Sequence, residues 1–202
     1  MYETINCSLF KESSVNWCEP KYIITPYIAE FWNTITGIPY ILLAIYGLSR
    51  MQKHPAIWFE IAGIGIGTIL FHGGRTLIGQ LIDEISIVLF LMTITSSLLN
   101  LKNTLLLHVA AAIAMFLYPP YNCHALFIVG LSAAIPLLLI AIMDSHTREQ
   151  IFHLFVLTVC GISLWLIEKY SCDCSQTSIC TYFHAIWHII MLIVCWWLVH
   201  VL

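Results

Sequence analysis

Two histidines stand four residues apart in the apolar run FHAIWHIIML, which covers residues 183–192. Residues with this spacing lie on one face of a helix, so His184 and His188 can bind one metal ion together. Histidine pairs of this kind also occur as hydrogen-bonded core residues. The pair alone therefore leaves a metal site and a structural role both open.

Three further residues with suitable chemistry lie at the ends of neighbouring apolar runs. His72 ends the run GTILFHGGR, Asp83 begins the run QLIDEISIV, and Thr68 precedes His72 by one helical turn. If successive runs cross a bilayer in alternating directions, His72 and Asp83 reach the same membrane face as His184 and His188. Ionisable groups at membrane depth are costly and normally face a partner inside a helical bundle. Three imidazoles beside an acid suit a catalytic zinc site, whose fourth position is left to water.

The composition indicates an all-α membrane protein. Of the 202 residues, 60% are hydrophobic and 9% are charged, whereas soluble domains carry roughly 25% charged residues. A membrane-spanning helix needs about 20 mainly apolar residues, so the chain has room for about seven. We therefore predict a seven-transmembrane helix bundle. Its spans are expected near residues 29–49, 56–73, 81–100, 103–118, 122–144, 150–168 and 180–201.

One domain boundary and two exclusions follow from the same distribution of residues. Residues 1–28 are expected to form a polar N-terminal segment, and residues 29–202 a single transmembrane domain. The N-terminal segment lacks an apolar core, so we expect no cleavable signal peptide. The few charges form no basic patch, which excludes a nucleic-acid partner and leaves the lipid bilayer.

Cysteines indicate the orientation of the chain in the membrane. Lysine and arginine are divided evenly between the two sides, so their distribution does not choose one. The loop cysteines all fall on the N-terminal side, and disulfides persist in oxidising compartments. We therefore expect a non-cytosolic N-terminus and a cytosolic C-terminus, although a cysteine can also serve as a small apolar residue. The loop cysteines are Cys7, Cys18, Cys123, Cys172, Cys174 and Cys180.

Three motifs in order along the chain resemble those of the alkaline ceramidases, a family of seven-span zinc-dependent membrane amidases. The first is NWCEP at residues 16–20, followed by YIAEFWNT at residues 27–34. The second combines Phe71-His72 with Gln80 and Asp83-Glu84, and the third is FHAIWH at residues 183–188. Residues 90–160 carry no motif of this family.

The resemblance implies a reaction and a role for each residue in it. The reaction is the hydrolysis of the amide of ceramide, a membrane lipid, to a sphingoid base and a free fatty acid. By position, His72, His184 and His188 would bind zinc, and Asp83 would orient the attacking water and transfer its proton. Thr68 stands where the family usually has serine, and it keeps the hydroxyl group.

The resemblance also implies a calcium site, which this sequence changes. The family's ligands are an aspartate, a tryptophan carbonyl, a glutamate, an asparagine and a later glutamate. Calcium prefers several hard anionic oxygens, so the present set predicts a weakened or missing calcium site. Lys21 brings an ammonium that could replace the ion by pairing with Glu19 and Glu30; alternatively, Lys21 points to solvent and calcium still binds. The positions read Asn16, Trp17, Glu19, Lys21 and Glu30.

A disulfide is implied by the same comparison. The family pairs the cysteine of its first motif with one just after the sixth span, which corresponds here to Cys18 and Cys172. Trp165 and Glu168 match the spacing around the second cysteine, although Glu168 stands where the family has an aspartate. Cys174 and Cys180 would remain for a second bridge.

Two other functions are compatible with parts of the pattern. A seven-span zinc-containing receptor of a related superfamily would share the histidines and the aspartate without hydrolysing ceramide. Such receptors usually carry a long soluble N-terminal region, which this sequence lacks. A structural or transport protein could also contain these histidines as hydrogen-bonded residues. That function does not explain why three histidines and an aspartate lie at one membrane face.

Overall fold

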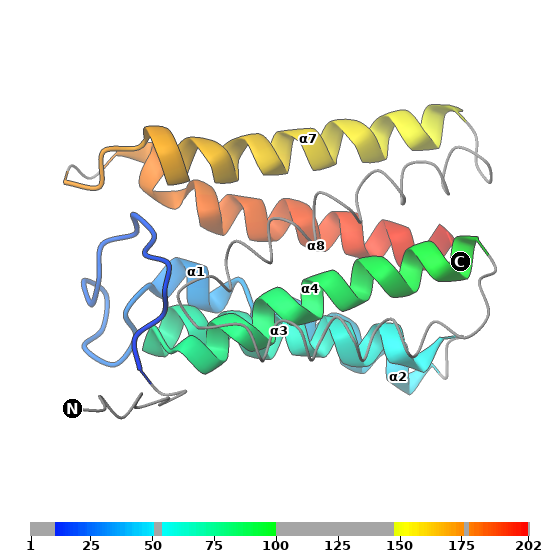
Figure 1. Cartoon of the computed structure of the whole chain (residues 1–202), viewed down its shortest axis with the longest axis horizontal. Helices are drawn as coiled ribbons and strands as arrows, with labels where there is room; N and C mark the ends of the chain where they lie inside the picture. Colours follow the sequence, from blue (N-terminus) through cyan, green and yellow to red (C-terminus); the bar gives the residue numbers. More distant parts are fainter. Residues whose placement is uncertain (1–10, 51–53, 100–147, 176–177, 202) are drawn as a thin grey trace, which may run out of the picture.

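The computed structural model describes residues 11–50, 54–99, 148–175 and 178–201, which form a non-helical N-terminal segment followed by helices (Figure 1). The helices are α1 (Phe31–Ile35), α2 (Ile38–Ser49), α3 (Pro55–Gly74), α4 (Leu77–Leu98), α7 (Arg148–Ser171) and α8 (Phe183–Val201). A short 3₁₀ helix, η1 (Ile179–Tyr182), leads into α8. No strand occurs among the described residues, which agrees with the all-α prediction.

Five segments are long and apolar enough to cross a membrane, which makes the chain a multi-pass membrane protein. Each overlaps a predicted span, whereas the predicted spans at 103–118 and 122–144 lie outside the described residues. Apolar side chains exposed on α2, α7 and α8 are the ones expected to face lipid, among them Leu42, Phe152 and Ile189. The five segments are Phe31–Ser49, Pro55–Gly74, Leu77–Leu98, Phe152–Ser171 and Ile179–His200.

Alternating helix directions bring the predicted site to one end of the molecule. The C-terminal end of α3, the start of α4, the end of α7 and the start of α8 all lie beside the N-terminal segment (Figure 1). The turn between α3 and α4 is short because Arg75 adopts a left-handed conformation, with φ of 52°. Thr76 then caps α4 by accepting a hydrogen bond from the Gly79 amide, at 3.2 Å.

Glycines allow α3 and α4 to pack with their backbones in contact. A Cβ atom on Gly67 would collide with the backbone of Asp83, and one on Gly79 would collide with the backbone of Leu70 and Phe71. Small residues at a helix interface permit this close approach in membrane proteins. The contact therefore sets the position of Asp83 relative to the end of α3.

The N-terminal segment packs into the molecule and is tied to the end of α7 by a disulfide. Val15, Trp17 and Cys18 are buried. The Cys18 sulfur is bonded to Cys174, with Cα atoms 4.7 Å apart, and a second disulfide joins Cys172 to Cys180, with Cα atoms 5.9 Å apart.

The predicted pairing of Cys18 with Cys172 is therefore wrong in this structure. Cys172 directly follows α7 and still donates a helical hydrogen bond to the Ile167 carbonyl, at 3.0 Å. Its backbone carbonyl, rather than its side chain, faces Cys18, at 4.0 Å from the sulfur. The Cys172 side chain is thus directed toward the α7–η1 connection, where Cys180 lies, and Cys174 reaches Cys18.

Candidate metal centre

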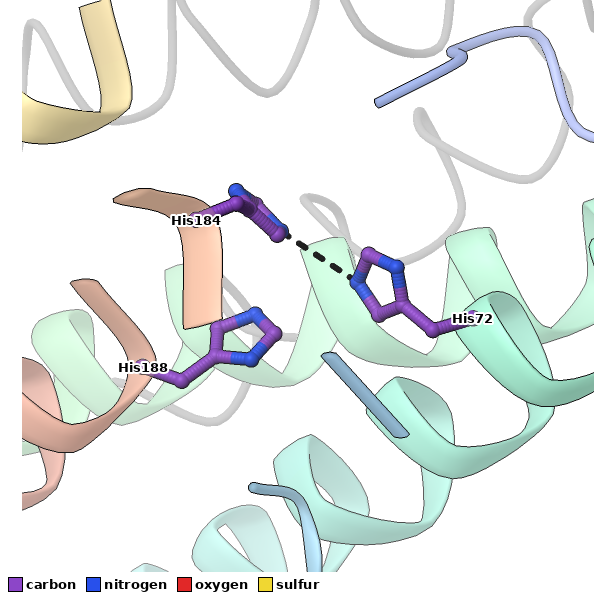
Figure 2. Close-up of side chains that lie close together, drawn as sticks. All are labelled: His72, His184 and His188. Carbon is purple, nitrogen blue, oxygen red and sulfur yellow. Dashed lines mark hydrogen bonds between the residues drawn. The ribbon is translucent and has the colours of Figure 1, made fainter. Parts of the chain in front are cut away.

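Three histidines from two helices meet in the interior of the bundle (Figure 2). His72 comes from the last turn of α3, and His184 and His188 come from the first two turns of α8. Each offers one ring nitrogen to a cluster whose atoms all lie within 4.8 Å of one another. Their exposed fractions are 0%, 2% and 2%, so water does not solvate these imidazoles.

Glu30 fixes the orientation of His72. The Nδ1 atom of His72 lies 2.6 Å from Oε2 of Glu30, and the Nε2 atom points toward the other histidines. Burial acts to raise the pKa of Glu30, but the hydrogen bond with His72 and the neighbouring Lys21 ammonium outweigh it and lower this pKa. An ionised carboxylate accepts hydrogen bonds only, so Nδ1 carries the proton and Nε2 keeps a lone pair.

Thr36 does the same for His188. Its hydroxyl lies 2.7 Å from Nδ1 of His188 and donates its only proton to the Asn33 carbonyl, at 2.8 Å. The hydroxyl therefore accepts a hydrogen bond from the Nδ1–H group, which leaves the lone pair on Nε2 of His188. Among the described residues, this buried Nε2 atom has no hydrogen-bond partner.

His184 is held by a stacked ring and by its backbone. Its imidazole lies against the indole of Trp17, with ring centroids 3.7 Å apart and planes 18° apart. Its backbone amide donates to Oε2 of Glu168, at 2.6 Å. The Nε2 atoms of His184 and His72 are 3.3 Å apart (Figure 2).

One separation within the donor set matches that expected for a tetrahedral metal ion. Two nitrogens that bind one zinc ion at about 2.0–2.1 Å with tetrahedral angles lie about 3.3–3.4 Å apart, the separation found between His72 and His184. A hydrogen bond can account for that one contact, but it leaves Nε2 of His188 without a partner. A cation shared by the three nitrogens would satisfy all of them.

Asp83 and Thr68 lie together beside this cluster. The Thr68 hydroxyl donates to Oδ1 of Asp83 at 3.1 Å, and both side chains are buried. Thr68, Asp83 and His188 line one cavity, whose wall is otherwise mostly apolar. The structure thus brings together all five residues predicted to form the site.

The predicted calcium-type residues gather around the Lys21 ammonium. Its Nζ atom contacts the Trp17 carbonyl, lies 2.9 Å from the Glu19 carbonyl, and forms an ion pair with Oε1 of Glu30 at 2.7 Å. The side chain of Asn16 is exposed. The expected pairing with Glu30 is confirmed, whereas Glu19 contributes its backbone oxygen.

The Glu19 carboxylate has a different role from the one predicted. Its two oxygens accept hydrogen bonds from the amides of Trp32 and Asn33, at 2.6 and 2.8 Å. These amides belong to the first turn of α1 and have no acceptor within that helix. Glu19 therefore caps α1 from outside the helix and leaves the Lys21 ammonium to backbone oxygens and Glu30.

Sequence reasoning gave no role in the site to Thr36 and Glu168, two of the residues that contact the histidines. Thr36 precedes Gly37 and Pro39, and this helix-breaking run separates α1 from α2 and turns its hydroxyl toward His188. Glu168 is an acid within an apolar run, a pattern that by itself suggests a buried partner. Neither signal identifies the partner.

Comparisons with known proteins agree with the motifs. The model of the ceramidase family matches residues 10–202. Human alkaline ceramidase 1 is 26% identical over 90% of this chain and 78% of its own length, and the Drosophila melanogaster alkaline ceramidase is 26% identical over 90% and 73%. A Saccharomyces cerevisiae alkaline ceramidase, YPC1, is 37% identical over 38% of this chain and 26% of its own length. The chain therefore belongs to the ceramidase family.

Proposed function

We propose that this protein is a zinc-dependent amidase that hydrolyses ceramide to a sphingoid base and a fatty acid within a seven-span membrane domain. The observation that carries the proposal is the buried cluster of His72, His184 and His188, which adjoins an apolar cavity. The alkaline ceramidases among the relatives support the substrate. No comparison supports the alternative of a zinc-containing receptor without hydrolytic turnover.

The three histidines would hold zinc through the nitrogens that face one another. Zinc bound there would supply Lewis-acid polarisation of the amide carbonyl and would lower the pKa of a water molecule. Glu30 and Thr36 would keep the protons of His72 and His188 on Nδ1, so that Nε2 stays available. This arrangement would set the tautomers of both rings before the metal binds.

Asp83 would act as general base and then general acid. Its carboxylate would take the proton of the attacking water and pass it to the nitrogen of the leaving sphingoid base. Thr68 would hold the carboxylate in place through the hydrogen bond to Oδ1. The second oxygen of Asp83 would then remain for the water.

The cavity would accept one hydrocarbon chain of the lipid. Its polar end is formed by Thr68, Asp83 and His188, and its lining continues to Leu154 and Leu198 near the opposite ends of their helices. An amide at the polar end would thus have its chain in apolar surroundings like those of the bilayer that it leaves, so the chain would not be exposed to water.

The first prediction separates the metal ligands from other histidines. We expect His184→Ala to lose both zinc and ceramide hydrolysis, because two imidazoles do not complete the site. The matched control is His200→Ala on the same helix, since His200 bonds the Trp196 carbonyl outside the cluster. Zinc content by mass spectrometry and product release in detergent measure the two effects. Unchanged turnover in His184→Ala would contradict the proposal.

The second prediction separates proton transfer from metal binding. Asp83→Asn keeps the shape and the contact with Thr68 but cannot take a proton. We expect kcat to fall by about 10²–10⁴-fold, the usual contribution of a general acid–base group, while zinc stays bound. Zinc content and kcat are measured on the same preparation. A variant that keeps wild-type turnover would exclude Asp83 from proton transfer.

We further propose that the Lys21 ammonium takes the place of calcium in the N-terminal segment. Its three oxygen partners come from Trp17, Glu19 and Glu30, which are three of the five positions that the resemblance assigns to calcium. The positive charge next to Glu30 would balance that carboxylate without an ion. The segment would then hold Glu30 against His72 at any calcium concentration.

The third prediction follows from this replacement. Calcium titration or EGTA should leave the activity and melting temperature of the wild type unchanged, with magnesium as the control for ionic strength. Lys21→Met should destabilise the protein by about 1–3 kcal/mol, because it removes one partner of a buried carboxylate. Strong activation of the wild type by calcium would refute the replacement and favour calcium binding with Lys21 displaced.

The fourth prediction concerns orientation and span number. We propose a non-cytosolic N-terminus and a cytosolic C-terminus, supported by the two disulfides at the end that carries the histidines. In sealed vesicles with the cytosolic face outward, a tag at the N-terminus should resist protease and one at the C-terminus should be removed. The same result for both tags would contradict seven spans.

A further inference from the structure

We propose that Glu168 is a positioning residue for the metal centre, because its carboxylate joins α7, the start of α8 and the N-terminal segment around His184. The metal part of this inference rests on the proposed function. Glu168 lies on α7 and is 1% exposed. Its two carboxylate hydrogen bonds come from backbone amides, and neither comes from an imidazole of the histidine cluster. Its influence on the metal would therefore pass through the residues that it holds.

The first of these residues is His184 itself. His184 is the second residue of α8, so its amide has no acceptor within the helix. Oε2 of Glu168 accepts from this amide at 2.6 Å, so the carboxyl group lies at the positive end of the helix dipole. The bond fixes the backbone from which the imidazole projects.

The second residue is Cys18, which belongs to a different segment. Oε1 of Glu168 accepts from the Cys18 amide at 3.0 Å. Cys18 follows Trp17, whose indole is stacked on the His184 ring at 3.7 Å between centroids. The second hydrogen bond therefore fixes the segment that carries the Trp17 indole, on which the His184 imidazole is stacked.

The two hydrogen bonds thus position the same imidazole in two ways. One fixes the backbone of His184, and the other fixes the segment whose indole covers the face of the His184 ring. The disulfide from Cys18 to Cys174 ties the same segment to the chain beyond α7. The Glu168 carboxylate instead bonds the backbone amides of both segments, including that of His184 itself. We infer that Glu168, rather than the disulfide alone, aligns Nε2 of His184 with Nε2 of His72 at 3.3 Å.

The test compares two substitutions of glutamate by glutamine within the membrane domain. Glu168→Gln replaces one acceptor oxygen by an NH₂ group, so one of the two amides loses its partner. The matched control, Glu60→Gln, changes a partly buried glutamate on α3 whose carboxylate accepts from Thr93 on α4, away from the histidines. Zinc affinity is measured by competition with a chelator, and amide hydrogen exchange at the start of α8 is measured on zinc-free protein.

We expect Glu168→Gln to bind zinc about 10–100-fold more weakly, as for other residues that orient metal ligands, and to exchange the amides at the start of α8 faster. Glu60→Gln should keep wild-type zinc affinity and wild-type exchange there. Equal zinc affinity in Glu168→Gln and wild type would overturn the proposal, and so would equal loss in both variants, which would indicate a general effect of stability.

Two further outcomes are distinguished by the same experiment. If the wild type binds no zinc, the proposed function fails, and exchange at the start of α8 decides alone: unchanged exchange in Glu168→Gln overturns the positioning role. If Glu168→Gln does not fold, Glu168→Asp replaces it, because the shorter side chain cannot keep both hydrogen bonds at 2.6 and 3.0 Å. Wild-type zinc affinity in Glu168→Asp would likewise overturn the proposal.

Discussion

The structure depends on the burial of three imidazoles at one level of a membrane bundle. A buried polar atom without a partner costs about 1–3 kcal/mol, so every ring nitrogen there needs an assigned neighbour. Glu30 takes the outer nitrogen of His72, and Thr36 takes that of His188. With these two outer nitrogens occupied, the inner ones face the centre of the cluster, where a shared cation would satisfy them together. The polar residues outside the cluster are therefore as necessary to the site as the histidines.

This requirement explains the irregular backbone at the start of the bundle. The interruption between α1 and α2 directs Thr36 to His188, and the next turn lets the Tyr40 hydroxyl donate to the His188 carbonyl, at 2.7 Å. The break is accommodated because a Cβ atom on Gly37 would approach the Gly65 carbonyl to 2.8 Å, a contact that only glycine avoids. A regular helix through residues 31–49 would carry the same side chains on a different face. The break between α1 and α2 thus places the Thr36 hydroxyl against the imidazole of His188.

The sequence predicts the parts of this arrangement that follow from short-range or topological rules. The five described spans and the meeting of His72, Asp83, His184 and His188 follow from apolar length, helical spacing and alternating direction. Other contacts depend on the path of the N-terminal segment, which hydrophobic periodicity does not predict. They are the disulfide pairing, the capping of α1 by Glu19 and the two hydrogen bonds of Glu168. Residues 1–28 look like a polar extension in the sequence, yet Trp17, Glu19 and Lys21 supply contacts to the site or to its supports.

The position of the site within the membrane suits an amphipathic substrate under the proposed function. Charged and hydrogen-bonding groups lie at the end of the bundle beside the N-terminal segment, and the cavity below them is lined mainly by apolar side chains. A lipid amide needs both surroundings at once, because its polar atoms lose water only if they gain partners. The polar end supplies those partners through the histidine and carboxylate groups, while the apolar wall accepts the chain. A soluble amidase would have to extract the whole lipid, whereas a site built into the bilayer needs only to admit the amide and one of its chains.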